Sequence, residues 1–206
     1  MLGTTHRYQT LDPKYEAEQL EVFGRMFMEG HIYRGLKPVN WSPSSRTALA
    51  EAELEYPPGH TSRSIYVAMP LASASDKVAD ILGKLGEGAS LALGIWTTTP
   101  WTIPANLAVA VNEKIEYVVA RVEGSDACLV VAEDLVEALA EKFGKSLSAV
   151  AKVTGAELEG CTYKHPLYAR ESPVVIGGDY ITTESGTGLV HTAPGHGQDD
   201  FIVGQK

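Results

Sequence analysis

Short apolar segments closed by glycine or proline dominate this chain after Ser62, and they limit the folds it can adopt. Most are predicted to be strands, because β-branched and other apolar residues in short runs suit a pleated sheet. The expected strands are Ile65–Met69, Ala89–Trp96, Leu107–Val111, Ile115–Val122, Ala127–Ala132, Ala149–Val153, Val174–Thr182 and Gly188–Thr192. Many short strands with few helices favour a closed or nearly closed barrel over a doubly wound sheet. The sequence therefore predicts a mainly β fold of the α+β class with peripheral helices.

Three segments carry helix signals. Asp12 suits an N-cap, Pro13 suits the first helical position, and Gly30 suits the end of the helix that follows. Apolar residues at helical spacing predict two further helices, over Asp76–Leu85 and over Asp134–Phe143, each followed by glycine. Before the first sheet strand, Ala52–Tyr56 alternates apolar and charged residues and predicts a half-exposed strand.

Two parts are expected along the chain. Residues 1–56 are predicted to be a connecting segment, and residues 57–206 a β-barrel domain with enough apolar residues, 44% of the whole chain, to build a core. The last residues fall a short way into a predicted helix. We therefore expect the chain to be a piece of a longer protein.

Composition excludes several classes of protein. The chain has no apolar run long enough to span a bilayer and no apolar segment typical of a secretory signal. Its two cysteines, Cys128 and Cys161, have no CxxC spacing, which argues against a zinc site and favours a reducing compartment such as the cytoplasm. A net charge of −9 disfavours tight binding of a nucleic acid by this chain alone. It still permits handling of a nucleic acid end that another domain presents.

A glycine-rich loop with two histidines and two adjacent carboxylates spans residues 186–201. Glycine lets a backbone approach a ligand closely, while histidine and carboxylate supply protons and charge. One interpretation is a metal-dependent hydrolase, whose ligands would be His191, His196, Asp199 and Asp200. No helical HExxH spacing accompanies them. Either aspartate could instead cap the helix that follows, and Asp199 is the expected N-cap.

A second polar stretch follows the expected strand that ends at Trp96. Residues 97–99 are three consecutive threonines, and the motif runs on to Asn106 as Thr-Thr-Thr-Pro-Trp-Thr-Ile-Pro-Ala-Asn. The ordinary interpretation of a threonine run is a β-branched strand end. Its pairing with the His/Asp loop favours a functional site.

The two motifs together resemble the editing domain, connective peptide 1, of isoleucyl-tRNA synthetase. The segments from Tyr15 to Ser45 and from Ala48 to Glu53 resemble the part of that enzyme that leads into the editing domain, so the likeness covers nearly the whole chain. Relatives that edit for valine or leucine tend to carry arginine in the threonine motif and an acidic residue where this chain has Trp101. The resemblance implies a closed β-barrel of the Val/Ile/Leu-tRNA synthetase editing type. The family's editing domain continues well past Asp200, so part of the barrel is expected to be missing.

The resemblance also implies an activity, which is hydrolysis of Val-tRNA(Ile) to valine and tRNA(Ile) without a covalent intermediate. On this basis Asp200 would hold the substrate α-ammonium and His191 would exclude isoleucine by size. The ester, the terminal adenosine and the attacking water would contact Thr97, Thr98 and Thr99, which together with Asp200 form the expected catalytic set. Which of the threonine hydroxyl groups orients the water is left open by the sequence.

The remaining expected substrate-binding residues come from both motifs. Trp96 would wall the pocket, Asn106 would fix the loop, and His196 would contact adenosine or be structural. Thr187 and Gly188 complete the set.

The implied partners are the tRNA(Ile) 3′ end carrying valine and the rest of a parent synthetase. The chain is expected to be a monomer in a bacterial-type cytoplasm, with an organelle as the alternative compartment. No metal or cofactor is expected for editing. ATP and Mg²⁺ would serve only a synthetase domain whose signatures this chain lacks. The other functional hypotheses are the metal-dependent hydrolase, a non-catalytic module that binds a tRNA end, and editing for a related synthetase.

Overall fold

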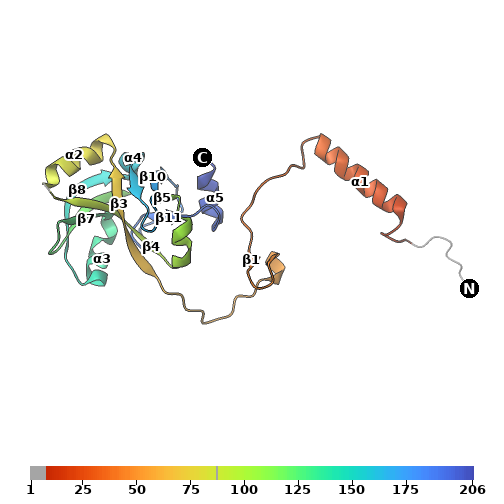
Figure 1. Ribbon diagram of the computed structural model, residues 1–206, viewed down its shortest axis with the longest axis horizontal. Helices are drawn as coiled ribbons and strands as arrows, with labels where there is room; N and C mark the ends of the chain where they lie inside the picture. Colours follow the sequence, from red (N-terminus) through yellow and green to blue (C-terminus); the bar gives the residue numbers. More distant parts are fainter. Residues whose placement is uncertain (1–7, 87) are drawn as a thin grey trace, which may run out of the picture. The chain divides into compact units, whose positions relative to one another are not determined.

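The computed structural model describes residues 8–86 and 88–206. The chain divides into two compact units, one ending at Lys37 and one from Pro38 to Lys206 (Figure 1). Residues 38–56, which the sequence grouped with the connecting segment, therefore fall in the same unit as the sheet. Where the functional domain begins remains a prediction.

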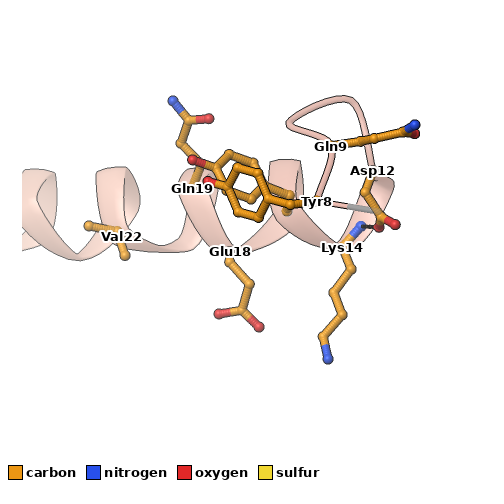
Figure 2. Close-up of a pocket in the computed structure, with 8 residues that line it drawn as sticks. Tyr8, Gln9, Asp12, Lys14, Glu18, Gln19 and Val22 are labelled. Atoms are coloured by element: carbon orange, nitrogen blue, oxygen red, sulfur yellow. Dashed lines mark hydrogen bonds between the residues drawn. The ribbon is translucent and has the colours of Figure 1, made fainter. Parts of the chain in front are cut away.

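The first unit is built around α1, Pro13–Met28. Its predicted start is confirmed, because the Asp12 carboxylate accepts a hydrogen bond of 2.9 Å from the Lys14 amide and Pro13 occupies the first turn. None of the residues of α1 is buried, and Phe23 and Phe27 are more than half exposed. A hollow of about 620 Å³ lies beside its first turns, lined by residues from Tyr8 to Val22 (Figure 2).

A short hairpin opens the second unit, with β1 (Trp41–Ser42) paired to β2 (Thr47–Ala48). The strand expected over Ala52–Tyr56 is wrong. Glu51–Glu53 forms a single 3₁₀ turn, η1, and residues 54–56 are not part of a strand. The Glu53 carboxylate accepts a hydrogen bond of 2.7 Å from the Ala50 amide. Alternation alone cannot make a strand here, since local bonds satisfy the backbone and no neighbouring strand pairs with it.

In the part of the chain that the structure describes, nine strands form one sheet, and the predicted strands correspond to most of them. Their bounds are β3 Ile65–Ser73, β4 Ser90–Thr97, β5 Ala108–Val111, β6 Glu116–Val122, β7 Ala127–Ala132, β8 Leu147–Thr154, β9 Thr162–Lys164, β10 Glu171–Ile176 and β11 Val190–Thr192. The order is β11-β5-β10-β9-β3-β4-β7-β6-β8. The β5–β10 and β4–β7 pairs are parallel and the others antiparallel. The fold is therefore mixed α/β.

The expected closed barrel is not confirmed. Within residues 8–86 and 88–206 the sheet ends at β11 on one side and at β8 on the other, with no ladder joining the two edges. The edge strand β11 has only three residues, and its ladder runs to β5 alone. Closure of a barrel needs a continuous ring of ladder bonds, and the described strands do not supply one.

One observed strand was not predicted, and one predicted strand is too long. The sequence missed β9, which has three residues and too little alternation to be recognised. It also placed the next strand over Val174–Thr182, whereas β10 ends at Ile176 and a loop follows through Gly178, whose φ is +116°. Only glycine adopts such a φ readily, which ends the strand there.

Helices pack against the sheet and bury apolar side chains in its core. They are α2 (Asp76–Leu85), α3 (Val136–Phe143), α4 (Gly155–Leu158) and α5 (Gln198–Gly204), with the 3₁₀ turns η2 (Pro100–Ala105) and η3 (Glu133–Leu135). The two longer ones confirm the predicted helices, and they bury Ile81 and Leu139 among the sheet's side chains. α5 lies at the β5–β11 end of the sheet (Figure 1). In the described residues, no helix is long and apolar enough to cross a membrane.

Candidate active site

The threonine motif and the His/Asp loop meet at one hollow of about 320 Å³, which we call the threonine–histidine hollow. The end of β4, the turn η2, the strand β11 and the start of α5 all contribute to it. Its lining residues are Trp96, Thr97, Thr98, Thr99, Thr102, Val190, His191, His196, Gly197 and Asp200. The structure thus brings together seven of the sequence-predicted site residues, namely Trp96, Thr97, Thr98, Thr99, His191, His196 and Asp200.

The loop before β11 depends on glycine at two points. Gly186 and Gly188 both have φ of +80°, in the region that other residues avoid. A Cβ on Gly186 would lie 3.0 Å from the Trp96 ring, and one on Gly188 would lie 2.4 Å from the Ala132 Cβ. These close approaches seat the loop against β4 and β7 and so carry β11 to the hollow.

His191 is held at the buried side of the hollow. His191 lies in β11 opposite Val109 of β5, and only 7% of its surface is exposed. The ring nitrogen Nε2 lies 2.8 Å from Thr102 Oγ1, and Nδ1 lies 2.8 Å from Asn106 Nδ2. Burial lowers the His191 pKa to about 4, with smaller contributions from the neighbouring His165 and His196. The imidazole is therefore neutral at physiological pH.

The threonines form a connected set of hydroxyl groups. Thr97 Oγ1 accepts a hydrogen bond of 3.1 Å from the Thr99 amide and lies 3.1 Å from Thr99 Oγ1. The turn η2 then brings Thr102 back, and its hydroxyl donates to the Thr99 carbonyl at 2.8 Å. Thr97 and Thr102 are buried while Thr98 and Thr99 are exposed.

Thr102 is a lining residue that the sequence interpretation missed. It follows Thr99 by three positions, and residues three apart eclipse each other on a 3₁₀ turn. The Pro100 and Pro104 that frame this turn were the available signal for it.

Asp200 supplies the charged side of the hollow. Its Oδ2 accepts a hydrogen bond of 2.8 Å from the Ala193 amide. Burial raises the Asp200 pKa above its usual value and the nearby Asp199 adds to the rise, while the Ala193 amide opposes it. A Cβ on Gly197 would lie 3.0 Å from the Asp200 carboxyl carbon, so glycine leaves room for this carboxylate.

The expected helix cap is wrong. Gly197, not Asp199, is the N-cap of α5, and both aspartates lie in the first turn. Acidic residues there favour the helix through its dipole. Asp199 is exposed and Asp200 half-buried, so the two adjacent carboxylates differ in environment.

Three residues expected to bind substrate do not line the hollow: Asn106, Thr187 and Gly188. Asn106 has no exposed surface. Thr187 is 2% exposed, bonds to the Leu189 carbonyl, and lines a separate apolar hollow of about 220 Å³. Gly188 packs against Ala132. None of the three therefore reaches the hollow, and Asn106 acts on it only through its hydrogen bond to His191.

The donors proposed for a metal do not converge. Among the described residues, no group of three or more His, Cys, Asp or Glu side chains is placed to hold a metal ion. Both ring nitrogens of His191 are already hydrogen-bonded to Thr102 and Asn106. The metal-dependent hydrolase therefore gains no support from the positions of its four proposed ligands.

The larger hollow beside α1 has a different character. Its lining includes Asp12, Lys14 and Glu18 on an exposed helix face but none of the motif residues (Figure 2). It offers no buried polar side chain. The threonine–histidine hollow is the better candidate site.

The sequence of this chain is similar to those of known proteins. The family model of the class I tRNA synthetases (I, L, M and V) matches residues 3–154. The chain belongs to this family. The isoleucine–tRNA ligase of a Synechococcus species is 66% identical over 199 residues, 97% of this chain and 20% of that protein. The isoleucine–tRNA ligase of Nostoc punctiforme is 61% identical over 97% of this chain and 21% of its own length. These relatives confirm the expected resemblance, and the chain spans about a fifth of their length.

Solved structures support the fold. The structure described as GlLeuRS-CP1 superposes with a TM-score of 0.57 at 21% identity, over 67% of this chain and 58% of that one. The editing domain of the P. falciparum cytosolic leucyl-tRNA synthetase gives a TM-score of 0.55 at 12% identity, over 68% and 64%. The second unit therefore has the fold of these editing domains, although its described strands form no closed barrel.

Proposed function

We propose that the threonine–histidine hollow hydrolyses the ester of Val-tRNA(Ile), as the editing site of an isoleucyl-tRNA synthetase. The observation that carries this proposal is that His191, Asp200 and the threonine hydroxyls all line one hollow. The partners are then the 3′ end of tRNA(Ile) and the rest of a parent synthetase. The compartment is the one where tRNA is charged, which is the cytoplasm for a bacterial-type enzyme.

The chemistry needed is modest. An aminoacyl ester is already activated, so positioning of the ester and of a water molecule supplies much of the rate. Asp200 is the anionic group that would pair with the α-ammonium, and such a charge-assisted bond is among the stronger ones available. The hydroxyls of Thr98 and Thr99, which are exposed, would contact the ester and the water.

His191 would set the size limit. Isoleucine and valine differ by one methylene, and their discrimination is the standard worked example of a group worth only about 1–3 kcal/mol in a pocket. A second site that admits valine and excludes isoleucine removes the error. His191 suits this role because it is buried, neutral and held by two hydrogen bonds. We propose no metal or cofactor for the reaction.

The test is a deacylation assay on this chain with tRNA(Ile) charged in turn with valine, threonine and isoleucine. We expect valine to be released and isoleucine retained. Equal hydrolysis of all three would contradict the proposed specificity, and a chain that folds yet hydrolyses none would favour the non-catalytic module. An arm with EDTA, followed by added zinc, separates the metal-dependent alternative: loss and recovery of activity would overturn the metal-free mechanism.

A further inference from the structure

A buried tyrosine lies behind His191. Tyr163 belongs to β9 and has no exposed surface. Its hydroxyl donates a hydrogen bond to the Asn106 side-chain oxygen, and Asn106 is also fully buried. The same amide bonds to His191, so Tyr163 is joined to the hollow through one intermediate residue. None of the sequence motifs includes this tyrosine.

The direction of each hydrogen bond that links Asn106, His191 and Thr102 can be assigned. Asn106 Nδ2 lies 2.9 Å from the Ala108 carbonyl, and because a carbonyl only accepts, the amide nitrogen must face it. The other Nδ2 proton then points to His191 Nδ1 at 2.8 Å. An amide NH₂ group only donates, so Nδ1 must carry no proton.

The directions of the remaining hydrogen bonds follow from that assignment. A neutral imidazole without a proton on Nδ1 carries it on Nε2, which donates to Thr102 Oγ1 at 2.8 Å. Thr102 in turn donates to the Thr99 carbonyl at 2.8 Å. Both ring nitrogens of His191 are committed, so the ring presents its carbon surface to the hollow and has no free nitrogen to act as a base.

Two neighbours of Tyr163 brace the same turn. His165 Nδ1 accepts from the amides of Leu167 and Tyr168, so its Nε2 carries the proton and donates to the Ile103 carbonyl at 2.9 Å. Arg170 donates to the Asn106 carbonyl. Side chains in β9 and between β9 and β10 therefore hold the main chain of η2 and both the main chain and the side chain of Asn106.

We propose that Tyr163 is a positioning residue of the hollow: together with the Ala108 carbonyl it fixes the Asn106 amide, and through that amide the Nε2–H tautomer and ring orientation of His191. The tautomer of His191 can be measured without any substrate and does not depend on the proposed function. Its consequence, rejection of isoleucine, rests on the proposed function.

The test compares Tyr163→Phe with Tyr117→Phe. Tyr117 is also fully buried and loses a hydroxyl that donates to the Gly188 carbonyl at 2.8 Å, so it matches Tyr163 in burial without touching Asn106. With ¹⁵N-histidine labelling of the 206-residue chain, NMR distinguishes protonated from unprotonated ring nitrogens. The His191 signals are assigned by their loss in His191→Gln.

We expect wild type and Tyr117→Phe to show one His191 tautomer, with Nδ1 unprotonated. Tyr163→Phe should add a population with Nδ1 protonated, because the Ala108 carbonyl is then the remaining group that orients the Asn106 amide. Asn106→Asp provides a second variant, because a carboxylate facing Nδ1 accepts and should move the proton there. A protonated Nδ1 in wild type would overturn the proposal even if no variant folds. So would an unchanged His191 tautomer in Tyr163→Phe or in Asn106→Asp.

The activity arm measures hydrolysis of Val-tRNA(Ile) and Ile-tRNA(Ile) by the same variants. Tyr163→Phe should lower the preference for valine by roughly two- to tenfold, the size expected for one hydrogen bond. Tyr117→Phe should leave that preference unchanged. If wild type hydrolyses neither ester, the proposed function fails while the NMR arm still decides the positioning role.

Discussion

Two groups of residues that line the threonine–histidine hollow are held by different physical principles. The first, which we call the buried wall, consists of His191 and Thr102, which are buried and bonded to each other. The second, which we call the charged wall, is Asp200, which is half-buried on the first turn of α5 and accepts a hydrogen bond from the Ala193 amide. In the proposed function the buried wall would select by shape. The second wall offers charge and remains open to solvent.

This difference separates stability from activity. A buried polar group that loses its partner destabilises the fold, whereas a half-exposed carboxylate can be rehydrated. Substitutions on the buried wall should therefore change the free energy of unfolding, and those on the charged wall should change the rate. The predictions below test that division, beginning with the largest effect.

Replacement of Asn106 by leucine should cost the most. It would leave the Tyr163 hydroxyl, the Ala108 carbonyl and His191 Nδ1 without their present partner in a buried place. Each such group costs about 1–3 kcal/mol, so a loss of roughly 3 kcal/mol or more is expected. Urea unfolding measures it. Asp200→Asn, on the charged wall, is the comparison and should change stability by less than about 1 kcal/mol.

Acid should weaken the buried wall next. The unfolded chain takes up a proton on His191 near the ordinary pKa of 6.5, but the folded chain does so only near about 4, because His191 is buried beside His165 and His196. The contribution of His191 to stability is thus full above pH 6.5 and is lost as the pH falls toward 4. It amounts to about 3 kcal/mol.

The measurement is urea unfolding at several pH values, with wild type and His191→Gln in parallel. The difference between their unfolding free energies should shrink on acidification over this window. A difference that is independent of pH would show that His191 titrates normally.

Loss of charge on the other wall should act on rate. Asp200→Asn keeps an acceptor for the Ala193 amide but removes the anion. A hydrogen bond to a charged group contributes about 1.5–3 kcal/mol, so Val-tRNA(Ile) deacylation should fall about 10- to 100-fold.

Asp199→Asn is the matched control for that loss, because Asp199 is exposed on the same helical turn and does not line the hollow. It should keep wild-type activity. Equal losses in the two variants would indicate a general effect of charge near α5 and would remove Asp200 from the proposed site.

The smallest expected effect is on specificity. His191→Ala enlarges the hollow on its shape-selecting side, and the ratio of valine to isoleucine release should fall about tenfold, within the range for one methylene. His196→Ala is the control, since His196 is an exposed residue that lines the same hollow. A ratio unchanged by His191→Ala would refute the sizing role.

Local features of this fold were predictable because their causes are local. Asp12 and Pro13 set the start of α1, and the apolar spacing of α2 and α3 matches their burial. The capping of α5 was not predictable in the same way. Asp199 has the right chemistry for a cap, yet Gly197 takes that place because the loop must leave room for the Asp200 carboxylate.

The sequence by itself determined which chemical groups the two motifs carry and which family they resemble. It could not determine their shared support, because Tyr163 and Asn106 come from separate strands and turns that meet only in the folded sheet. Nor could it reveal that Asn106 lies behind His191, or which ring nitrogen of His191 carries the proton. Those features depend on burial and on the direction of hydrogen bonds, which exist only once distant segments pack together.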